Sequence, residues 1–416
     1  MRIIYLHQYF VTPDQPGGTR SYEIARRMVA AGHEVHMVST YRKTPAPAKI
    51  GQWLESDVEG IHLHQLVNPY DQSMSYAARI RSFLRYALQS MRRATSLRGD
   101  LIYATSTPLT VAIPALYASK RNRIPMIFEV RDLWPEGPIA VGALRNPLAI
   151  RAARWLERKA YFGAANVVAL SPDMVKGVKA TGYPEDRILL IPNGSDTGLF
   201  RVPPSSGEAF LREHPHLAEG PLLVYCGSLG VLNGIDYLIQ LAAHMSQIDP
   251  SVRFLVVGYG RDEENLVTEA LKLGIYEKNL WFMTRIPKRE LPPILSACKM
   301  AFSLFINHPY TAQNSPNKAF DTFAAGRPLA VNHSGWIAEL ISQTGAGLTL
   351  PPGDPCAAAR SIRDFLADPA RQEKACAASA HLGSTRFERN RLVQDLLDLI
   401  EDLPPHHRPA QEVHPC

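Results

Sequence analysis

Short apolar runs alternate with amphipathic stretches along this chain, and the alternation starts twice, once at the N-terminus and again near residue 222. Strands that alternate with helices predict βαβ units and parallel sheets. The expected strands are residues 3–7, 35–39, 61–66, 101–104, 126–130, 167–170 and 188–191, followed by 222–226, 254–257, 280–283, 300–305 and 329–331.

Turn-forming residues between positions 192 and 207 separate the two series. A chain of 416 residues is also too long for one ordinary hydrophobic core. We therefore predict an α/β fold of two doubly wound, Rossmann-like domains, residues 1–198 and 199–385, which face each other across a cleft. Ligands of such sheets bind beyond the carboxyl ends of the strands. A last helix within residues 386–403 precedes a Pro- and His-rich tail, residues 404–416, which is predicted to be disordered.

Charge is unevenly distributed between the two halves. Residues 1–200 contain 25 Lys and Arg against 16 Asp and Glu, whereas the remainder contains 20 against 23. This asymmetry indicates an anionic partner for the first half. Nucleic acid is disfavoured because the basic residues lack interleaved aromatics and no nucleic-acid motif occurs.

A membrane surface is the better candidate for that partner. Two predicted helices, residues 76–93 and 145–159, combine apolar residues at helical spacing with arginines, a pattern typical of helices that lie on an anionic leaflet. The alternative is an ordinary amphipathic helix with a solvated basic face. The arginines that we expect to face the membrane are Arg79, Arg85, Arg92, Arg151, Arg154 and Arg158.

Bulk features indicate a cytoplasmic protein. No apolar run reaches the roughly 18–20 residues that span a bilayer, and the N-terminus reads as a first strand rather than a signal peptide. The five cysteines are odd in number and scattered, which argues for a reducing compartment. These features predict a cytoplasmic chain at the inner face of the membrane.

The segment 314–328 has the features of a site for a sugar nucleotide. Ser315 is expected to be the N-cap of a helix and Pro316 its first residue, and the stop is expected at Gly326. A helix N-terminus attracts a diphosphate, and Lys318 adds a full charge one turn in. Asp321 lies one turn further on, where a carboxylate can accept both ribose hydroxyls. The alternative is a well-capped surface helix with an ion pair.

Two sequences in the first half follow predicted strands. Gly17 and Gly18 precede Arg20 at the start of the first expected helix, where glycines allow close approach to an anion. Arg131 and Asp132 follow an apolar strand, where a carboxylate partnered by arginine can orient or deprotonate a hydroxyl acceptor. The alternatives are a tight turn at the glycines and a helix cap at Arg131 and Asp132.

In the second half, the predicted strand 222–226 runs into a glycine-bearing loop that starts at Gly227 and Ser228 and precedes a helix. Phosphate contact and a plain turn explain this loop equally well. No Asp-x-Asp occurs, so the carboxylate pair that commonly holds a metal on a nucleotide diphosphate is absent. The chain also lacks the P-loop, HExxH and GxSxG motifs and the GxGxxG dinucleotide fingerprint. We therefore expect neither a metal nor a cofactor.

Taken in order, these pieces resemble the retaining GT-B glycosyltransferases of family 4. The likeness is closest to the bacterial branch that builds O-antigen and other exopolysaccharides, including fucosamine-transferase-like members. It covers about residues 1–390. The matching segments are residues 17–20, 32–35, 131–135, 191–194, 227–230, 257–258, 315–318 and 324–328.

The resemblance implies a site between the domains and no obligatory metal. It implies that Gly18 lies beside the donor diphosphate, that Lys318 binds phosphate and that Asp321 binds the ribose. Asp132 would lie near the acceptor hydroxyl, and the last helix would pack back on the first domain. The residues assigned to the donor on this basis are Gly17, Gly18, Arg20, Gly227, Ser228, Asn233, Arg285, Ser315, Pro316, Asn317, Lys318 and Asp321.

Four positions depart from the family pattern. Two glutamates often lie eight positions apart in the family, whereas this chain has Gln313 and Asp321 there. Ser228 and Asn233 replace an Arg and a Lys that clamp the diphosphate in many members. Neutralisation of the donor would then depend on Lys318, aided by Arg285 or Arg20.

The predicted function is that of a retaining glycosyltransferase. It would move a hexose or aminosugar from a nucleoside diphosphate, with UDP expected first, to a polyprenyl-linked saccharide of a surface polysaccharide. Other possibilities are a UDP-sugar epimerase or phosphorylase on the same plan and a catalytically silent partner that binds the sugar nucleotide in an assembly complex. A Rossmann oxidoreductase is disfavoured because the dinucleotide fingerprint is missing.

Overall fold

Fourteen strands and the helices that connect them make up the protein in the computed structural model, which describes residues 1–403 except 16, 43–44, 46, 71–73 and 141. The N-terminal domain contains β1 (Arg2–Leu6), β2 (Glu34–Tyr41), β3 (Trp53–Val58), β4 (Ile61–Val67), β5 (Leu101–Thr105), β6 (Met126–Val130), β7 (Asn166–Ala169) and β8 (Ile188–Leu190). The C-terminal domain contains β9 (Leu222–Ser228), β10 (Arg253–Tyr259), β11 (Leu280–Thr284), β12 (Met300–Ser303), β13 (Leu329–Val331) and β14 (Gly347–Thr349).

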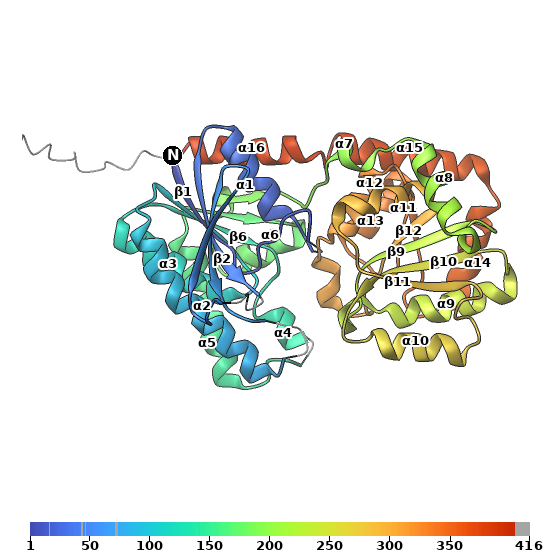
Figure 1. Cartoon of the computed structure of the whole chain (residues 1–416), viewed down its shortest axis with the longest axis horizontal. Coiled ribbons are helices and arrows are strands. Elements are labelled where there is room, and N and C mark those ends of the chain that lie inside the picture. Colours follow the sequence, from blue (N-terminus) through green and yellow to red (C-terminus); the bar gives the residue numbers. More distant parts are fainter. Residues whose placement is uncertain (16, 43–44, 46, 71–73, 141, 404–416) are drawn as a thin grey trace, which may run out of the picture.

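Helices flank both sheets (Figure 1). The α-helices of the first half are α1 (Arg20–Ala30), α2 (Tyr76–Ser96), α3 (Ala112–Asn122), α4 (Glu136–Ala140), α5 (Pro147–Gly163), α6 (Pro172–Ala180) and α7 (Thr197–Phe200). Those of the second half are α8 (Pro204–Glu213), α9 (Ile235–Ile248), α10 (Glu263–Lys272), α11 (Leu291–Ala297), α12 (Asn317–Ala324), α13 (Trp336–Thr344), α14 (Pro355–Leu366), α15 (Pro369–Ser384) and α16 (Arg389–Glu401). Short 3₁₀ turns are η1 (Leu109–Val111), η2 (Glu185–Arg187), η3 (Pro215–Leu217), η4 (Val231–Asn233), η5 (Lys288–Glu290) and η6 (Pro309–Gln313).

The strand order confirms the prediction of two doubly wound sheets. It is β3-β4-β2-β1-β5-β6-β7-β8 in the N-terminal domain and β11-β10-β9-β12-β13-β14 in the C-terminal domain. The only antiparallel pair among the described strands joins β3 to β4 in a hairpin, with Trp53 opposite Leu66. All twelve predicted strands are present, with small differences at their ends. β3 and β14 were not predicted, because the centre of β3 is polar and exposed and β14 has only three residues.

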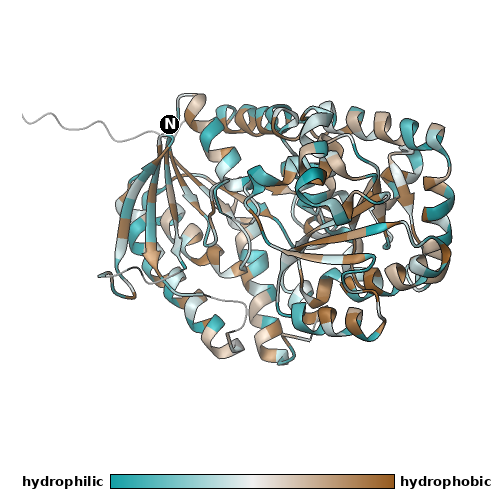
Figure 2. Ribbon diagram, turned by 45° about the vertical axis from the view of Figure 1, so that its right-hand side comes forward, coloured by the Kyte–Doolittle hydropathy of each residue, from teal (hydrophilic) through white to brown (hydrophobic). Residues whose placement is uncertain are grey.

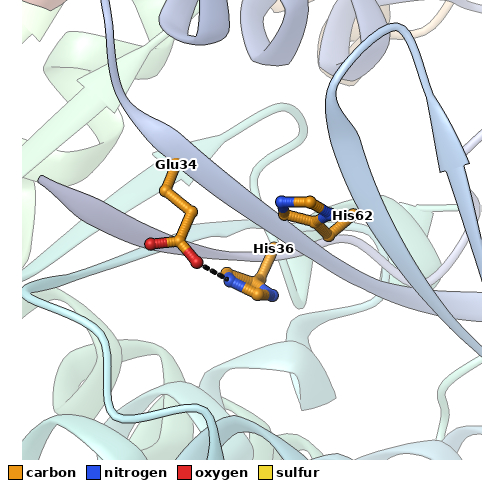
Figure 3. Close-up of side chains that lie close together, drawn as sticks. All are labelled: Glu34, His36 and His62. Carbon is orange, nitrogen blue, oxygen red and sulfur yellow. Dashed lines mark hydrogen bonds and ion pairs between the residues drawn. The ribbon is translucent and has the colours of Figure 1, made fainter.

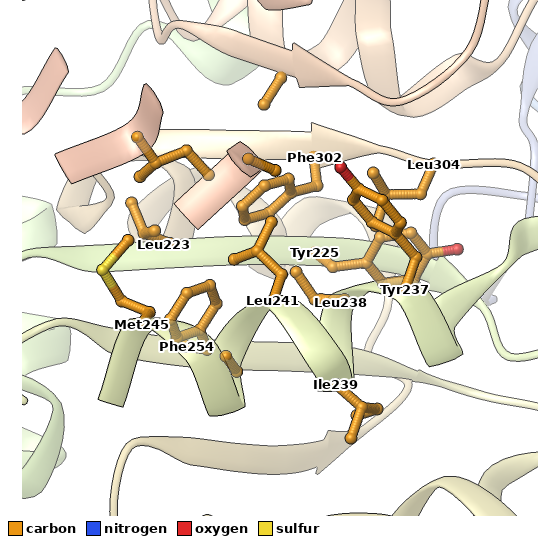
Figure 4. Packing of buried hydrophobic residues seen from close by; sticks show 14 of the residues in the cluster. Leu223, Tyr225, Tyr237, Leu238, Ile239, Leu241, Met245, Phe254, Phe302 and Leu304 are labelled. Atoms are coloured by element: carbon orange, nitrogen blue, oxygen red, sulfur yellow. The ribbon is translucent and has the colours of Figure 1, made fainter. Parts of the chain in front are cut away.

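Buried apolar side chains hold each sheet against its helices, and Figure 2 shows many hydrophobic residues along the strands. In the C-terminal domain, Tyr225 of β9, Phe254 of β10 and Phe302 of β12 pack with Leu241 and Met245 of α9 (Figure 4). Burial of such apolar surface is the main force that keeps a sheet and its helices together. The carboxyl ends of β9 and β10 are thereby fixed where their loops emerge.

The last helix, α16, belongs to the core of the N-terminal domain although it follows the C-terminal one. Leu396 and Ile400 are fully buried in a cluster with Ile3 and Tyr5 of β1. Figure 1 shows α16 in red, lying along the N-terminal domain beside α1. The chain therefore passes between the domains twice, once near residue 195 and once near residue 387, where Ser195 and Phe387 share a backbone hydrogen bond of 3.2 Å. The predicted disordered tail, residues 404–416, lies outside the described residues.

Candidate functional site

The N-terminus of α12 lies at the junction between the two domains, and its cap differs from the prediction. Pro316 is the N-cap, with extended backbone (φ −74°, ψ 125°), so the helix begins one residue later than expected. Ser315 does not cap the helix and instead binds the interdomain linker: its hydroxyl accepts from the Asn193 N–H at 3.4 Å and its carbonyl from Asn193 Nδ2 at 2.6 Å. The first N–H groups of α12 remain available at the junction, as the prediction of an anion site requires.

Lys318 lies in the first turn of α12 and reaches back to the loop after β9. Its Nζ atom donates to the Tyr225 hydroxyl at 2.8 Å and to Asn233 Oδ1 at 3.0 Å, and it lies 4.4 Å from the centre of the Tyr225 ring. Burial lowers the pKa of Lys318 to about 7. The ammonium thus has only neutral partners here, and an anion beside it would restore its charge.

Gly227 makes room for this arrangement. A Cβ atom at residue 227 would lie 2.8 Å from the Tyr225 hydroxyl and 3.2 Å from Lys318 Cε. The adjacent Ser228 accepts a hydrogen bond from the Tyr225 hydroxyl through its carbonyl, at 3.0 Å. The structure therefore brings together Gly227, Ser228, Asn233 and Lys318, which the sequence had assigned to one site.

Arg285 follows β11 at the same edge of the sheet. It is exposed, and its guanidinium lies 4.9 Å from the centre of the Tyr259 ring at the end of β10. Tyr259 is paired in register with Ser228. A second cation thus lies near the β9 loop without being part of the Lys318 cluster.

Gly18 meets α12 from the N-terminal domain. A Cβ atom at residue 18 would lie 2.9 Å from Asn317 Nδ2, closer than real Cβ atoms come, and 3.7 Å from Arg131 Nη2. Gly17 beside it has φ +143°, which side chains of L-residues rarely adopt. This glycine pair lets the loop after β1 touch the helix that carries Lys318.

Arg131 and Asp132 line the same junction at the end of β6. Arg131 Nη1 lies 3.2 Å from His7 Nε2, and Asp132 Oδ2 accepts from the Thr107 hydroxyl at 3.1 Å. Burial raises the pKa of the Asp132 carboxyl, although the Arg131 charge opposes that rise. Burial, followed by the charges of Arg131 and Arg42, holds the pKa of His7 well below its usual range, so the imidazole is neutral at pH 7.

The three-residue spacing predicted that Asp321 and Lys318 project from one face of α12. In the structure the two side chains do not share an open surface. The Asp321 side chain is buried, and Oδ1 accepts from Lys288 Nζ at 2.9 Å and from the Ser195 hydroxyl at 2.8 Å. The prediction considered only the spacing within α12. It missed that η5 supplies a lysine and the linker a serine to the same carboxylate.

The position of Arg20 contradicts a second prediction, that this residue helps to neutralise the donor diphosphate. Its guanidinium is buried in the N-terminal domain, where it binds Glu129 at 2.8 Å and donates to the Ile191 and Pro192 carbonyls. Its charge is already matched by Glu129, so it is not a free cation for a diphosphate. Arg20 ties the start of α1 to β6 and to the linker.

The sequence missed three residues of this site. His7 ends an apolar strand at the carboxyl edge of the sheet, a position that could have indicated it. Tyr225 lies inside an apolar run and Lys288 in the short turn η5, and neither has a signal in the sequence. Their roles come from contacts with Lys318 and Asp321 that join distant segments.

Two facing Rossmann-like domains, with glycine loops and a helix N-terminus at their junction, define the GT-B class of glycosyltransferases. Family models agree with this class: a glycosyl transferase 4-like domain matches residues 17–194, and the glycosyl transferases group 1 model matches residues 208–381. The chain belongs to the group 1, family 4 glycosyltransferases.

Individual relatives are more distant. The chain is 28% identical over 274 residues to the probable glycosyltransferase WbjE of Pseudomonas aeruginosa, a match that covers 64% of this chain and 66%, just under two thirds, of that protein. The structure of Anabaena HepE, solved in complex with UDP and glucose, superposes with a TM-score of 0.73 at 19% identity over 97% of this chain and all of HepE. WaaG, a glycosyltransferase involved in lipopolysaccharide biosynthesis, superposes with a TM-score of 0.71 at 15% identity over 96% of this chain and all of WaaG. At these identities the two structures show the shared fold.

Proposed function

We propose that the protein is a retaining glycosyltransferase that takes a sugar from a nucleoside diphosphate, with UDP as the first candidate. One observation carries this proposal: Lys318, Asn233 and the Gly227 loop converge at the N-terminus of α12, directly opposite Gly18. A buried lysine beside free helix N–H groups is suited to a diphosphate. The HepE structure with UDP supports the choice of base.

In this proposal the diphosphate lies between Lys318 and the Gly18 loop. Arg285 is the second cation within the donor site, and the first turn of α12, from Asn317, supplies backbone donors. Oδ1 of Asp321 is held by Lys288 and Ser195, and we assign Oδ2 to the ribose hydroxyls. These groups can neutralise the donor without a bound metal.

Arg131 and Asp132 are the groups that we assign to the acceptor side. Asp132 would orient the attacking hydroxyl, and Arg131, fixed by the neutral His7, would face the donor across Gly18. In a front-face mechanism the acceptor hydroxyl gives its proton to the departing phosphate as the new glycosidic bond forms. Lys318 would then stabilise the charge that develops on that phosphate.

Binding and turnover together test this proposal. At UDP about 100-fold above its Kd, linkage gives roughly 2.7 kcal/mol of stabilisation, which raises the melting temperature of such a domain by about 5–10 °C. We expect this shift for UDP, without added metal, and smaller ones for GDP, ADP, CMP and NAD. Incubation with UDP-sugars should then release UDP and form a retained linkage on a saccharide acceptor.

Other outcomes favour the alternatives. Binding of UDP-sugar without turnover would support a silent partner, and conversion to another UDP-sugar would support an epimerase. A shift with NAD alone would contradict the whole proposal.

For the acceptor, we propose a lipid-linked saccharide of O-antigen or another surface polysaccharide, used at the inner face of the cytoplasmic membrane. WaaG, which shares the fold, acts in lipopolysaccharide biosynthesis. Among the described helices, none combines enough length and apolarity to cross a bilayer. We assign the contact with the membrane to a surface of the N-terminal domain.

Helices α2 and α5 provide such a surface, with α3 packed between them. Leu88, Leu148 and Trp155 are 62%, 76% and 61% exposed. Of the predicted arginines, Arg92, Arg151, Arg154 and Arg158 are exposed, whereas Arg79 lies over the Tyr70 ring and Arg85 donates to Asn68. Exposed apolar side chains next to arginines can enter the headgroup region of an anionic leaflet.

Vesicle binding tests this surface. Each basic residue near an anionic leaflet contributes about 1 kcal/mol, so Arg151→Gln/Trp155→Ser should weaken binding to phosphatidylglycerol vesicles about tenfold or more in co-sedimentation. The matched control, Leu271→Ser/Lys272→Gln on α10, replaces an exposed apolar–basic pair of the C-terminal domain. Equal binding by both variants and the unchanged protein would rule out the α2–α5 surface.

A further inference from the structure

Histidines and carboxylates gather on the N-terminal sheet at the amino ends of β2 and β4, opposite the edge that carries Gly18. His36 of β2 is paired in register with His62 of β4, and their ring centroids are 4.9 Å apart. Glu34 lies two residues before His36 and therefore on the same face of the sheet. Figure 3 shows the three side chains grouped beside these strands.

The spacing of these groups suits a single cation. One ligand atom from each of Glu34, His36 and His62 lies within 4.8 Å of the other two. Tetrahedral ligands about 2.0–2.1 Å from a zinc ion are roughly 3.3 Å from one another. Closure by about 1.5 Å is within reach of side-chain rotation, since the side chains of Glu34 and His62 are 41% and 48% exposed. Glu34 Oε1 and His36 Nε2 are already 2.9 Å apart.

A second layer of groups orients the three ligands. His62 Nδ1 lies 3.1 Å from Asp57 Oδ2, Glu34 Oε2 binds Arg2 at 2.9 Å, and His36 Nδ1 lies 3.0 Å from His64 Nε2. These bonds leave Glu34 Oε1, His36 Nε2 and His62 Nε2 as the ligand atoms for a metal. A carboxylate on the far nitrogen of a histidine ligand is the usual support in metal sites, because it fixes the tautomer.

The side chains of the nearby arginines do not fill the place of a cation between Glu34, His36 and His62. Arg2 is bound to the far oxygen of Glu34, and Arg93 is bound to Glu55 at 2.6 Å. Both positive charges are thus matched by carboxylates beside the cluster.

We propose that Glu34, His36 and His62 bind one divalent transition-metal cation of the zinc, cobalt and nickel class, with water completing the coordination. Imidazole and carboxylate ligands favour this class over magnesium or calcium. The site joins β2 to β4 far from the donor site, so its role is structural. The inference does not depend on the proposed glycosyltransferase activity.

Titration of the full chain with Co²⁺ tests the site through its visible d–d absorption. The tail sequence contains His406, His407, His414 and Cys416, so the titration is run in a His406→Gln/His407→Gln/His414→Gln/Cys416→Ser background. We expect one equivalent of Co²⁺ to bind and Zn²⁺ to displace it. His36→Gln/His62→Gln should lower the affinity at least about 100-fold, whereas the control His214→Gln/His216→Gln should leave it unchanged.

Two results would overturn the proposal. One is the absence of Co²⁺ d–d absorption in the background protein, and the other is a Co²⁺ affinity of His36→Gln/His62→Gln equal to that of the background protein. If that double variant does not fold, Asp57→Asn decides, because it leaves all three ligands in place. A roughly 10- to 100-fold weaker affinity is then expected, and an unchanged affinity would contradict the site.

Discussion

Replacing Lys318 by alanine should reduce UDP affinity and kcat/KM by about 100-fold or more. Truncating one partner of a buried, charge-assisted contact costs roughly 2–5 kcal/mol, and a loss of 2.7 kcal/mol corresponds to about 100-fold. Few other cations can compensate, because Arg20 is bound to Glu129 and Lys288 to Asp321. Isothermal titration with UDP and initial rates with a UDP-sugar measure the two quantities.

The control for this variant is Lys299→Ala, which removes an exposed lysine of the same domain. Its UDP affinity should equal that of the unchanged protein. The fold of Lys318→Ala should persist, because the lysine has only neutral partners in the free protein and its removal leaves no unpaired charge. Unchanged UDP affinity in a folded Lys318→Ala protein would contradict the donor site.

Dependence on pH provides a second readout of Lys318. Its pKa is about 7 in the free protein because of burial, and a bound diphosphate favours the charged form. UDP affinity should therefore fall as the pH rises above 7, by up to about tenfold per unit until the pKa of the bound state is reached. Because guanidinium stays charged throughout this range, Lys318→Arg should flatten the profile between pH 7 and 9.

Prediction from the sequence succeeded where a local pattern alone determines the structure. Apolar runs placed the strands, and the glycines and the Lys318 segment identified residues that meet at the domain junction. It failed where the partner comes from a distant segment. From its motif alone, Arg20 was expected to be a free cation. Its partner Glu129 lies 109 positions away in the sequence, so the motif could not reveal the ion pair. Asp321 is held by groups from the linker and from η5, and no spacing within α12 could reveal them.

Replacing Glu129 by glutamine should destabilise the protein by about 3–5 kcal/mol, because it leaves the Arg20 charge buried without its partner. Glu129 is fully buried and also accepts from the Tyr103 hydroxyl at 2.8 Å and the Thr105 hydroxyl at 2.7 Å. For a domain of this size the melting temperature should fall by roughly 6–20 °C. Thermal melting followed by circular dichroism measures the change.

The pH dependence of this loss identifies the carboxylate as its cause. Burial alone would raise the pKa of Glu129, but the charges of Arg20 and Arg131, together with the hydrogen bonds from Arg20 and Thr105, outweigh it and lower the pKa overall. A carboxyl with a depressed pKa stabilises the fold above its unfolded pKa, near 4.3, and loses that contribution as the pH falls through the folded value. The difference between the unchanged protein and Glu129→Gln should therefore be largest near neutral pH and shrink in acid.

Glu185→Gln is the matched control, since it removes an ion pair to Lys179 in which both side chains are more than half exposed. Exposed pairs contribute only about 0–1 kcal/mol, so its melting temperature should hardly change. Equal falls in melting temperature for the two variants would contradict the conclusion that burial of the Arg20–Glu129 pair causes the loss of stability. Arg20 also donates to the Ile191 and Pro192 carbonyls, so the loss of its partner Glu129 should also loosen the linker from which the second domain begins.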